Sequence, residues 1–266
     1  MINERDYLAQ VQKSAPRQFA NILRTATGDG ERVLRIHFGD AAFERMQQLA
    51  QNMATTPSGT VVVLPGILGS ELYENDEHIW IGIWNIIRGD FDQLQLDAAG
   101  HSIKAIQAPT PLKDYYGELQ LSLLQRWNVV AFPFDWRLDI REVARQLKEK
   151  IDASGPGASG FSLVAHSLGG LVVRSFLQQF PDYINRVQKF IMMGTPNYGS
   201  FAIPVFGLLA AICYRYDSEE LRRECPRCGR VTKLHDAVCM RCGEELEFPD
   251  VAIAPEAWSR EVAGRG

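Results

Sequence analysis

The stretch FSLVAHSLGG, residues 161–170, decides how this chain of 266 residues folds. Its first five residues are apolar except for Ser162, and such a run is typical of a strand buried in a parallel sheet. An apolar helical segment follows from residue 168 and ends before Pro181, because proline cannot continue a helix. Ser167 therefore lies at a junction between a strand and a helix.

A serine at such a junction has the sequence context of a nucleophile elbow. The turn is tight, so the positions two residues before and after the serine must be small, and here they are Ala165 and Gly169. The amides at the start of the following helix favour negative charge, which makes the Leu168 amide a candidate oxyanion donor. A serine that merely caps a helix is the alternative interpretation, but the flanking strand favours the elbow.

Other segments on both sides of this stretch repeat the alternation of strand and helix. Apolar runs predict three more strands, at residues 60–64 (TVVVL), 128–134 (NVVAFPF) and 187–193 (VQKFIMM). A helix with apolar residues at helical spacing is expected over residues 140–151. The pattern predicts an α/β fold in which helices cover both faces of a parallel sheet.

The loop after the first predicted strand, LPGILGS at residues 64–70, is a candidate source of a second oxyanion donor. Gly66 and Gly69 allow its backbone to approach a substrate closely. An ordinary turn at the end of a strand would explain the loop equally well.

Four strings in a fixed order carry a family resemblance: LPGILGSEL, FPFDWRLD, AHSLGGLVVR and GTPNYGS. Over roughly residues 60–205 the chain resembles the lecithin:cholesterol acyltransferase-like family of α/β-hydrolases. The resemblance implies that Ser167 is the nucleophile and that the backbone amides of Leu68 and Leu168 form the oxyanion hole. It also implies lipid-like acyl esters as substrates, cleaved by water or transferred to an alcohol, with no catalytic cofactor.

The motif at residues 135–137 contains a carboxylate that could be mistaken for the acid of a catalytic triad. Asp135 precedes the serine, whereas this fold orders the triad as serine, acid, histidine. A scaffold role is favoured, with Trp136 packed and Arg137 paired with a carboxylate.

A dense apolar patch at residues 79–87 is open to three interpretations. It could form the wall of an acyl pocket or contact a lipid surface. Ordinary core is the interpretation that we favour.

A base and an acid that complete the triad are not evident. Both should follow Ser167, but the only later histidine is His235, which lies between cysteine pairs beside Asp236 and is a weak candidate. His166 directly precedes the serine and should be aimed elsewhere. Three more histidines precede it in the wrong order: His37, His78 and His101. We therefore expect a fold that is incomplete at its C-terminal side, with an apolar sheet edge at residues 187–193.

Four of the five cysteines form two matching Cys-x-x-Cys-Gly units: Cys225, Cys228, Cys239 and Cys242. Four thiolates suit one tetrahedral Zn²⁺ with no open position for a catalytic water. The spacing predicts a structural zinc site in a module resembling a zinc ribbon, which could dock a protein partner.

Charge and hydropathy limit the other classes of function. The net charge is −4, which argues against nucleic acid as a partner. The N-terminal residues MINERDYLAQ lack the apolar region of a signal peptide. The longest apolar stretch is shorter than the roughly 20 residues that a membrane-spanning helix needs. We expect a cytoplasmic protein without a transmembrane segment.

The predicted organisation has four parts: a helical N-terminal extension with one short strand (1–56), the α/β-hydrolase core (57–216), the zinc-ribbon-like module (217–248) and a tail (249–266). The leading hypothesis is a serine-dependent ester hydrolase or acyltransferase. The alternative is a catalytically incomplete hydrolase, truncated, split or a pseudoenzyme, that acts as a zinc-ribbon interaction protein.

Overall fold

The computed structural model describes residues 3–75, 77–80, 94, 96–97, 100–104, 106–155, 160–200, 222–224, 226–228, 231–233 and 242. The chain divides into two units, Met1–Tyr198 and Gly199–Gly266, which are taken separately below. The limits predicted at residues 56, 216 and 248 stay predictions. Within the described residues, no helix has both the length and the apolar character needed to cross a membrane.

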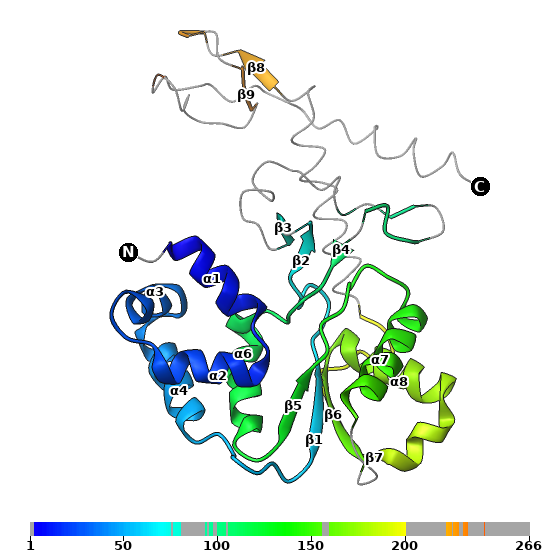
Figure 1. Ribbon diagram of the computed structural model, residues 1–266. Coiled ribbons are helices and arrows are strands. Elements are labelled where there is room, and N and C mark those ends of the chain that lie inside the picture. The colour runs from blue at the N-terminus through cyan, green and yellow to red at the C-terminus, as the bar shows by residue number, and fades with distance from the viewer. Residues whose placement is uncertain are drawn as a thin grey trace, which may run out of the picture. The chain divides into compact units, whose positions relative to one another are not determined.

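The first unit is built around a parallel sheet of four strands in the order β5-β1-β6-β7 (Figure 1). In that order the strands are Asn128–Ala131, Thr60–Leu64, Phe161–His166 and Val187–Met193. All four predicted strands are therefore present, although β5 ends three residues early. Pro133 has no amide hydrogen to give to a ladder, so the chain leaves the sheet there.

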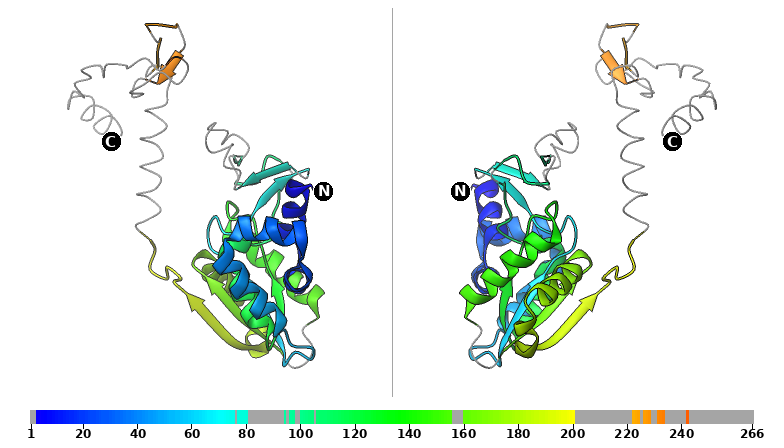
Figure 2. Two further views of the ribbon diagram at one scale, coloured as in Figure 1. Left: turned by 90° about the vertical axis from the view of Figure 1, so that its left-hand side faces the viewer. Right: turned by 90° about the vertical axis from the view of Figure 1, so that its right-hand side faces the viewer.

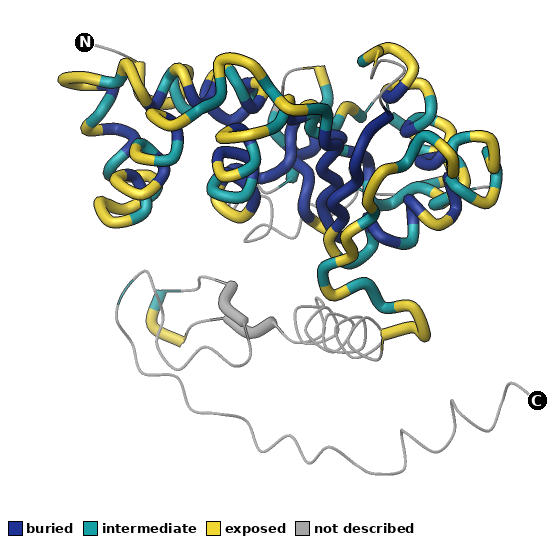
Figure 3. Tube along the Cα trace, turned by 90° about the horizontal axis from the view of Figure 1, so that it is seen from below, coloured by how far each residue is buried: buried dark blue, intermediate teal, exposed yellow. Residues whose placement is uncertain are grey.

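Alternation along β1 sends its side chains into two separate cores. Val61 and Val63 pack with one cluster, and Val62 and Leu64 pack with the other. The second cluster contains residues of α7 (Ile140–Ser154) and α8 (Leu168–Gln179). Figure 2 shows these two helices on the opposite side of the sheet from the N-terminal helices, and Figure 3 shows the buried strands between the layers.

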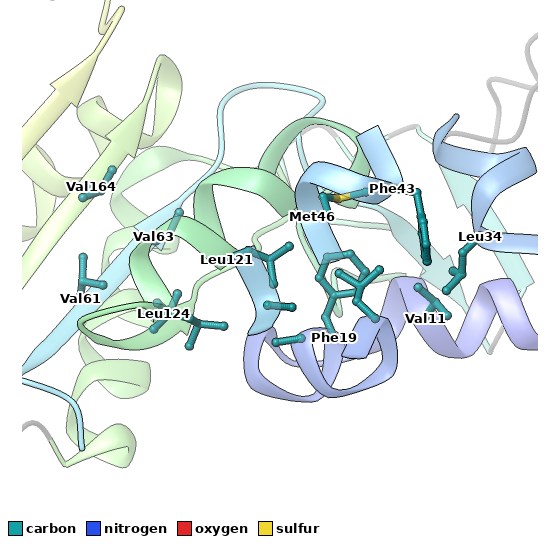
Figure 4. Packing of buried hydrophobic residues seen from close by; sticks show 14 residues of the cluster. Val11, Phe19, Leu34, Phe43, Met46, Val61, Val63, Leu121, Leu124 and Val164 are labelled. Atoms are coloured by element: carbon teal, nitrogen blue, oxygen red, sulfur yellow. The ribbon is translucent and has the colours of Figure 1, made fainter. Parts of the chain in front are cut away.

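The first 56 residues form one of these layers. They contain four helices: α1 (Glu4–Lys13), α2 (Pro16–Thr25), α3 (Gly28–Phe38) and α4 (Asp40–Gln51). The short strand expected in this region is absent from the described part of it. Phe19 of α2 and Met46 of α4 join Leu121 of α6 (Lys113–Leu124) and Val63 of β1 in a single core, which Figure 4 shows in detail. The helical region is thus part of the cover of the sheet.

Smaller elements are also described in both units. A three-stranded antiparallel sheet, β3-β2-β4, is formed by Glu77–Trp80, Leu72–Glu74 and Ile106–Gln107. A 3-10 helix, η2 (Pro181–Arg186), leads into β7. In the second unit, β8 (Arg222–Glu224) pairs antiparallel with β9 (Val231–Lys233).

The last strand of the main sheet has a different environment from its neighbours. Among the described strands, β7 pairs only with β6. Its side chains include Ile191, which is 49% exposed, and Met192, which is 45% exposed. The expected apolar edge is therefore present within the described part of the chain.

Candidate active site

The turn between β6 and α8 has the strained backbone that an elbow requires. Ser167 has φ 48° and ψ −118°, a region that a residue with a Cβ rarely adopts. Holding a residue in this backbone conformation costs about 1–3 kcal/mol of conformational free energy, and favourable contacts of the surrounding residues must offset that cost. The Ser167 amide donates to the Met193 carbonyl at 2.8 Å, and the Gly170 amide donates to the Ser167 carbonyl at 3.0 Å. The predicted turn is present, with the serine directly before the helix.

Small residues around the serine bring other segments into contact with it. A Cβ on Gly169 would lie 2.5 Å from the Pro65 carbonyl oxygen, and a Cβ on Gly66 would lie 3.0 Å from the Cβ of Ser167. These separations are too short for larger residues. The elbow and the loop after β1 therefore meet directly, as oxyanion donors from both segments would require.

The loop after β1 has a fixed shape of its own. Leu68 has φ 60°, and its carbonyl accepts a hydrogen bond from Nε1 of Trp80 at 3.1 Å. The Gly69 amide donates to the Gly66 carbonyl at 3.1 Å and closes the turn. At the end of the loop, the Ser70 hydroxyl accepts from the Phe134 amide. We call residues 65–69 the oxyanion loop below.

The two amides predicted to hold an oxyanion have no competing acceptor among the described residues. The Leu168 amide is at the first position of α8, where an N–H group has no partner within the helix. The Leu68 amide donates no hydrogen bond to any other described residue. Their role as an oxyanion hole stays a prediction that this arrangement supports.

A cavity of about 470 Å³ lies beside the elbow, bounded by the oxyanion loop, α6 and the ends of two strands. Its wall is largely apolar: Ile67, Leu68, Gly69, Trp80, Leu112, Tyr115, Tyr116, Leu119, His166 and Met193. Mostly apolar cavities with a few polar groups are typical of small-molecule sites. From the apolar patch at 79–87, Trp80 contributes to this wall and Ile79 is buried, while residues 81–87 lie outside the described part.

Sequence reasoning missed the buried tyrosine of this wall, Tyr116. Its hydroxyl accepts a hydrogen bond from the Gly66 amide at 2.9 Å and lies 2.8 Å from Nδ1 of His166. Burial raises the pKa of Tyr116 above its ordinary value. No local motif marks this tyrosine, since its partners are 50 residues away along the chain.

The four described histidines have separate partners. His37 lies 3.4 Å from Asp114, and that hydrogen bond raises the pKa of His37. His78 stacks on Tyr73, His101 contacts Asp97, and His166 contacts Tyr116. The Ser167 hydroxyl makes no hydrogen bond to any described residue. His235 lies outside the described residues, so its candidacy as the base stays untested.

The Asp135–Arg137 motif is part of the scaffold, as predicted. Nε of Arg137 donates to Oδ1 of Asp135 at 2.8 Å, and Nη2 lies 2.5 Å from Oδ2. The two side chains are 7% and 4% exposed, so solvent screens this pair little. Trp136 packs against the core that contains α7 and α8.

Two of the four predicted zinc ligands, Cys225 and Cys239, lie outside the described residues, and Cys228 and Cys242 are partly exposed. Where side chains are described, no three of His, Cys, Asp or Glu come together as a metal site would need. The described strands do frame the first cysteine pair, because residues 225–228 lie between β8 and β9.

Comparison with known proteins supports the resemblance seen in the motifs. Residues 123–207 match the family model described as lecithin:cholesterol acyltransferase, a segment that includes Asp135–Arg137, the elbow and β7. An uncharacterized protein of Saccharomyces cerevisiae is 27% identical over 160 residues, which are 52% of this chain and 23% of that protein. The chain thus spans about a quarter of that relative's length. The predicted resemblance is confirmed over residues 123–207, and the parallel sheet with helices on both faces fits the α/β fold that this resemblance implies.

Proposed function

We propose that this chain acts on lipid-like esters through an acyl-enzyme on Ser167, as an ester hydrolase or an acyltransferase. The single observation that carries the proposal is the strained backbone of Ser167 at the start of α8. Strain of this kind persists only where the surrounding structure enforces it. Here it holds a serine next to two amides without competing acceptors and next to an apolar cavity.

The proposed reaction uses these groups in a fixed order. The Ser167 hydroxyl oxygen attacks the acyl carbon, and its proton passes to a base. The Leu68 and Leu168 amides stabilise the negative charge that develops on the carbonyl oxygen. The bond to the alcohol then breaks, the base returns the proton to the leaving oxygen, and the acyl group stays on Ser167. Water or a second alcohol, deprotonated by the base, takes the acyl group and restores the serine.

The source of the base separates this proposal from its alternative. In a serine protease, loss of the base costs on the order of 10⁶ in turnover. A rate acceleration of about 10³–10⁴ over the reaction in water can remain, because the oxyanion hole and substrate binding still contribute. The Ser167 hydroxyl has no hydrogen-bond partner among the described residues, and His235 lies outside them. In the alternative no base is supplied, and the chain binds acyl ligands without rapid turnover.

We also propose a structural Zn²⁺ held by Cys225, Cys228, Cys239 and Cys242. The support is the spacing of the four thiols together with the antiparallel pairing of β8 and β9, which precede and follow the first Cys-x-x-Cys unit in the sequence. Metal analysis of the purified chain should find one zinc per molecule. A Cys225→Ser and Cys239→Ser double variant should lose it. Full zinc retention in that variant would overturn the proposal.

Labelling with a fluorophosphonate tests the nucleophile. An activated serine attacks phosphorus and displaces fluoride, which leaves one adduct visible by intact mass. We expect one adduct on the wild type and none on Ser167→Ala. The matched control is Ser154→Ala at the end of α7, whose hydroxyl donates to the Lys150 carbonyl of its own helix. This variant should label normally. A folded wild-type protein that takes no adduct would contradict the proposal and leave the binding alternative.

A further inference from the structure

The Tyr116 hydroxyl joins three segments that are distant in the sequence. It projects from α6, accepts the Gly66 amide of the oxyanion loop, and contacts His166 of the elbow at 2.8 Å. Tyr116 is 7% exposed and its bond with Gly66 is buried, so water competes little for that bond, whereas the partner in the other bond, His166, is itself exposed. Because Ser167 and Leu168 follow His166 directly, one hydroxyl links the loop that carries one predicted oxyanion donor to the turn that carries the nucleophile and the other.

The donor count of this junction favours one direction for its bonds. A phenol has one hydrogen to donate and can accept from others. The Gly66 N–H group donates to Tyr116, so the phenolic hydrogen is available for Nδ1 of His166. In that arrangement Nδ1 accepts and Nε2 carries the imidazole proton. The reverse arrangement would leave the phenolic hydrogen without an acceptor among the described residues.

The rest of the oxyanion loop depends on where Gly66 is held. Gly66 and Gly69 are the two ends of a hydrogen-bonded turn, and Leu68 lies between them. On its other side, the loop is fixed by Trp80 through the Leu68 carbonyl. A Cβ on Gly69 would come within 2.9 Å of the Tyr116 hydroxyl, so the loop lies directly against the phenol. Movement of Gly66 would therefore move the turn that carries the Leu68 amide.

We propose that Tyr116 is a positioning residue that sets the distance between the oxyanion loop and the nucleophile elbow. This inference rests on the proposed function. It assigns Tyr116 no contact with the reacting atoms, since the residue acts through the Gly66 amide and His166. Oxyanion stabilisation depends on donors that are already in place before charge develops. The phenol supplies that preorganisation, and its ring forms part of the cavity wall.

The test compares Tyr116→Phe with Tyr183→Phe. The first change removes one hydroxyl and keeps the ring. The second removes a tyrosine hydroxyl that donates to Asp152, away from the elbow. We expect the second-order rate constant of fluorophosphonate labelling to fall about tenfold in Tyr116→Phe. This is less than the fall of about 10²–10³ in kcat that loss of an oxyanion donor itself causes. Tyr183→Phe should label at the wild-type rate.

Steady-state kinetics with a short-chain p-nitrophenyl ester separate positioning from substrate binding. If turnover is measurable, kcat should fall in Tyr116→Phe while KM changes little, because the cavity wall keeps its ring. Both variants are measured at a temperature where their melting curves show folded protein. A fall in labelling no larger than that of Tyr183→Phe would overturn the inference, as would a change confined to KM.

Two spectroscopic measurements test the role of Tyr116 without an activity assay. Amide hydrogen exchange of Gly66 should be about tenfold faster in Tyr116→Phe, since its acceptor is lost. The ¹⁵N spectrum of His166 should show an unprotonated Nδ1 in the wild type and a mixture of tautomers in the variant. A wild type that takes no label contradicts the proposed function, and these readouts then decide on Tyr116. Unchanged Gly66 exchange and His166 signals would overturn its role.

Discussion

Strands β6 and β7 are parallel neighbours in one sheet, yet they have opposite environments. In β6 the first five residues are all buried, and the strand leads into the strained turn at Ser167. In β7 the residues paired with Val164 and Ala165 are Ile191 and Met192, which are each nearly half exposed. The comparison shows that the nucleophile is held by a fully packed strand, while the next strand presents apolar side chains without matching cover among the described residues.

The largest difference between the two strands should come from a buried charge. Val164→Asp places a carboxylate in the core between the sheet and α6. Ile191→Asp places a carboxylate on β7 at the half-exposed residue that is paired with Val164. We expect Val164→Asp to lose about 4 kcal/mol of unfolding free energy or not to fold, and Ile191→Asp to change it by less than about 1 kcal/mol. Urea unfolding measures both. Equal losses would show that β7 is as well packed as β6.

A smaller effect is expected from a single methyl group at the elbow. In Gly169→Ala the new Cβ would lie 2.5 Å from the Pro65 carbonyl oxygen, and backbone cannot move aside cheaply. We expect a loss of about 1–3 kcal/mol together with loss of fluorophosphonate labelling. The comparison variant on β7 is Met192→Ala, which should label normally. Normal labelling by Gly169→Ala would contradict the close approach of the elbow and the loop.

A still smaller effect on folding is expected from a charge at the outer edge of the sheet. Exposed apolar strand edges promote association, and lysine at an edge opposes it. Met192→Lys should leave unfolding free energy within about 0.5 kcal/mol of the wild type. Light scattering at increasing concentration should show less association than for the wild type. Equal association would indicate that β7 is covered.

Removal of zinc should have the smallest effect on β6 and β7. If the proposed zinc site is structural, a chelator should disturb the second unit, where the cysteines lie, and leave labelling of Ser167 unchanged. Intact mass of the labelled protein before and after chelation measures this. Loss of labelling with the zinc would instead connect the cysteine-rich segment to the nucleophile and make His235 the first candidate for the base.

Local sequence predicted much of the fold. The apolar runs that form β1, β5, β6 and β7 are long enough to be recognised, and the four strands appear in the predicted parallel sheet. Ala165 and Gly169 indicated the elbow, because the tight turn requires small residues two positions before and after the serine, and those positions can be read directly from the sequence. The strand expected within residues 1–56 was wrong for the described part, where four helices cover the sheet. Packing against α6 and β1, which a local pattern does not contain, favours the helical form.

The sequence by itself therefore determined the order of strands and helices, the place of Ser167, and the resemblance to α/β-hydrolases, because each depends on residues that are close along the chain. Only the tertiary structure decided how Tyr116 contacts Gly66 and His166 and how Trp80 fixes Leu68. Those features depend on distances between segments that are far apart in sequence. Such distances are set by the packing of the whole sheet and its covering helices, and no short motif records them.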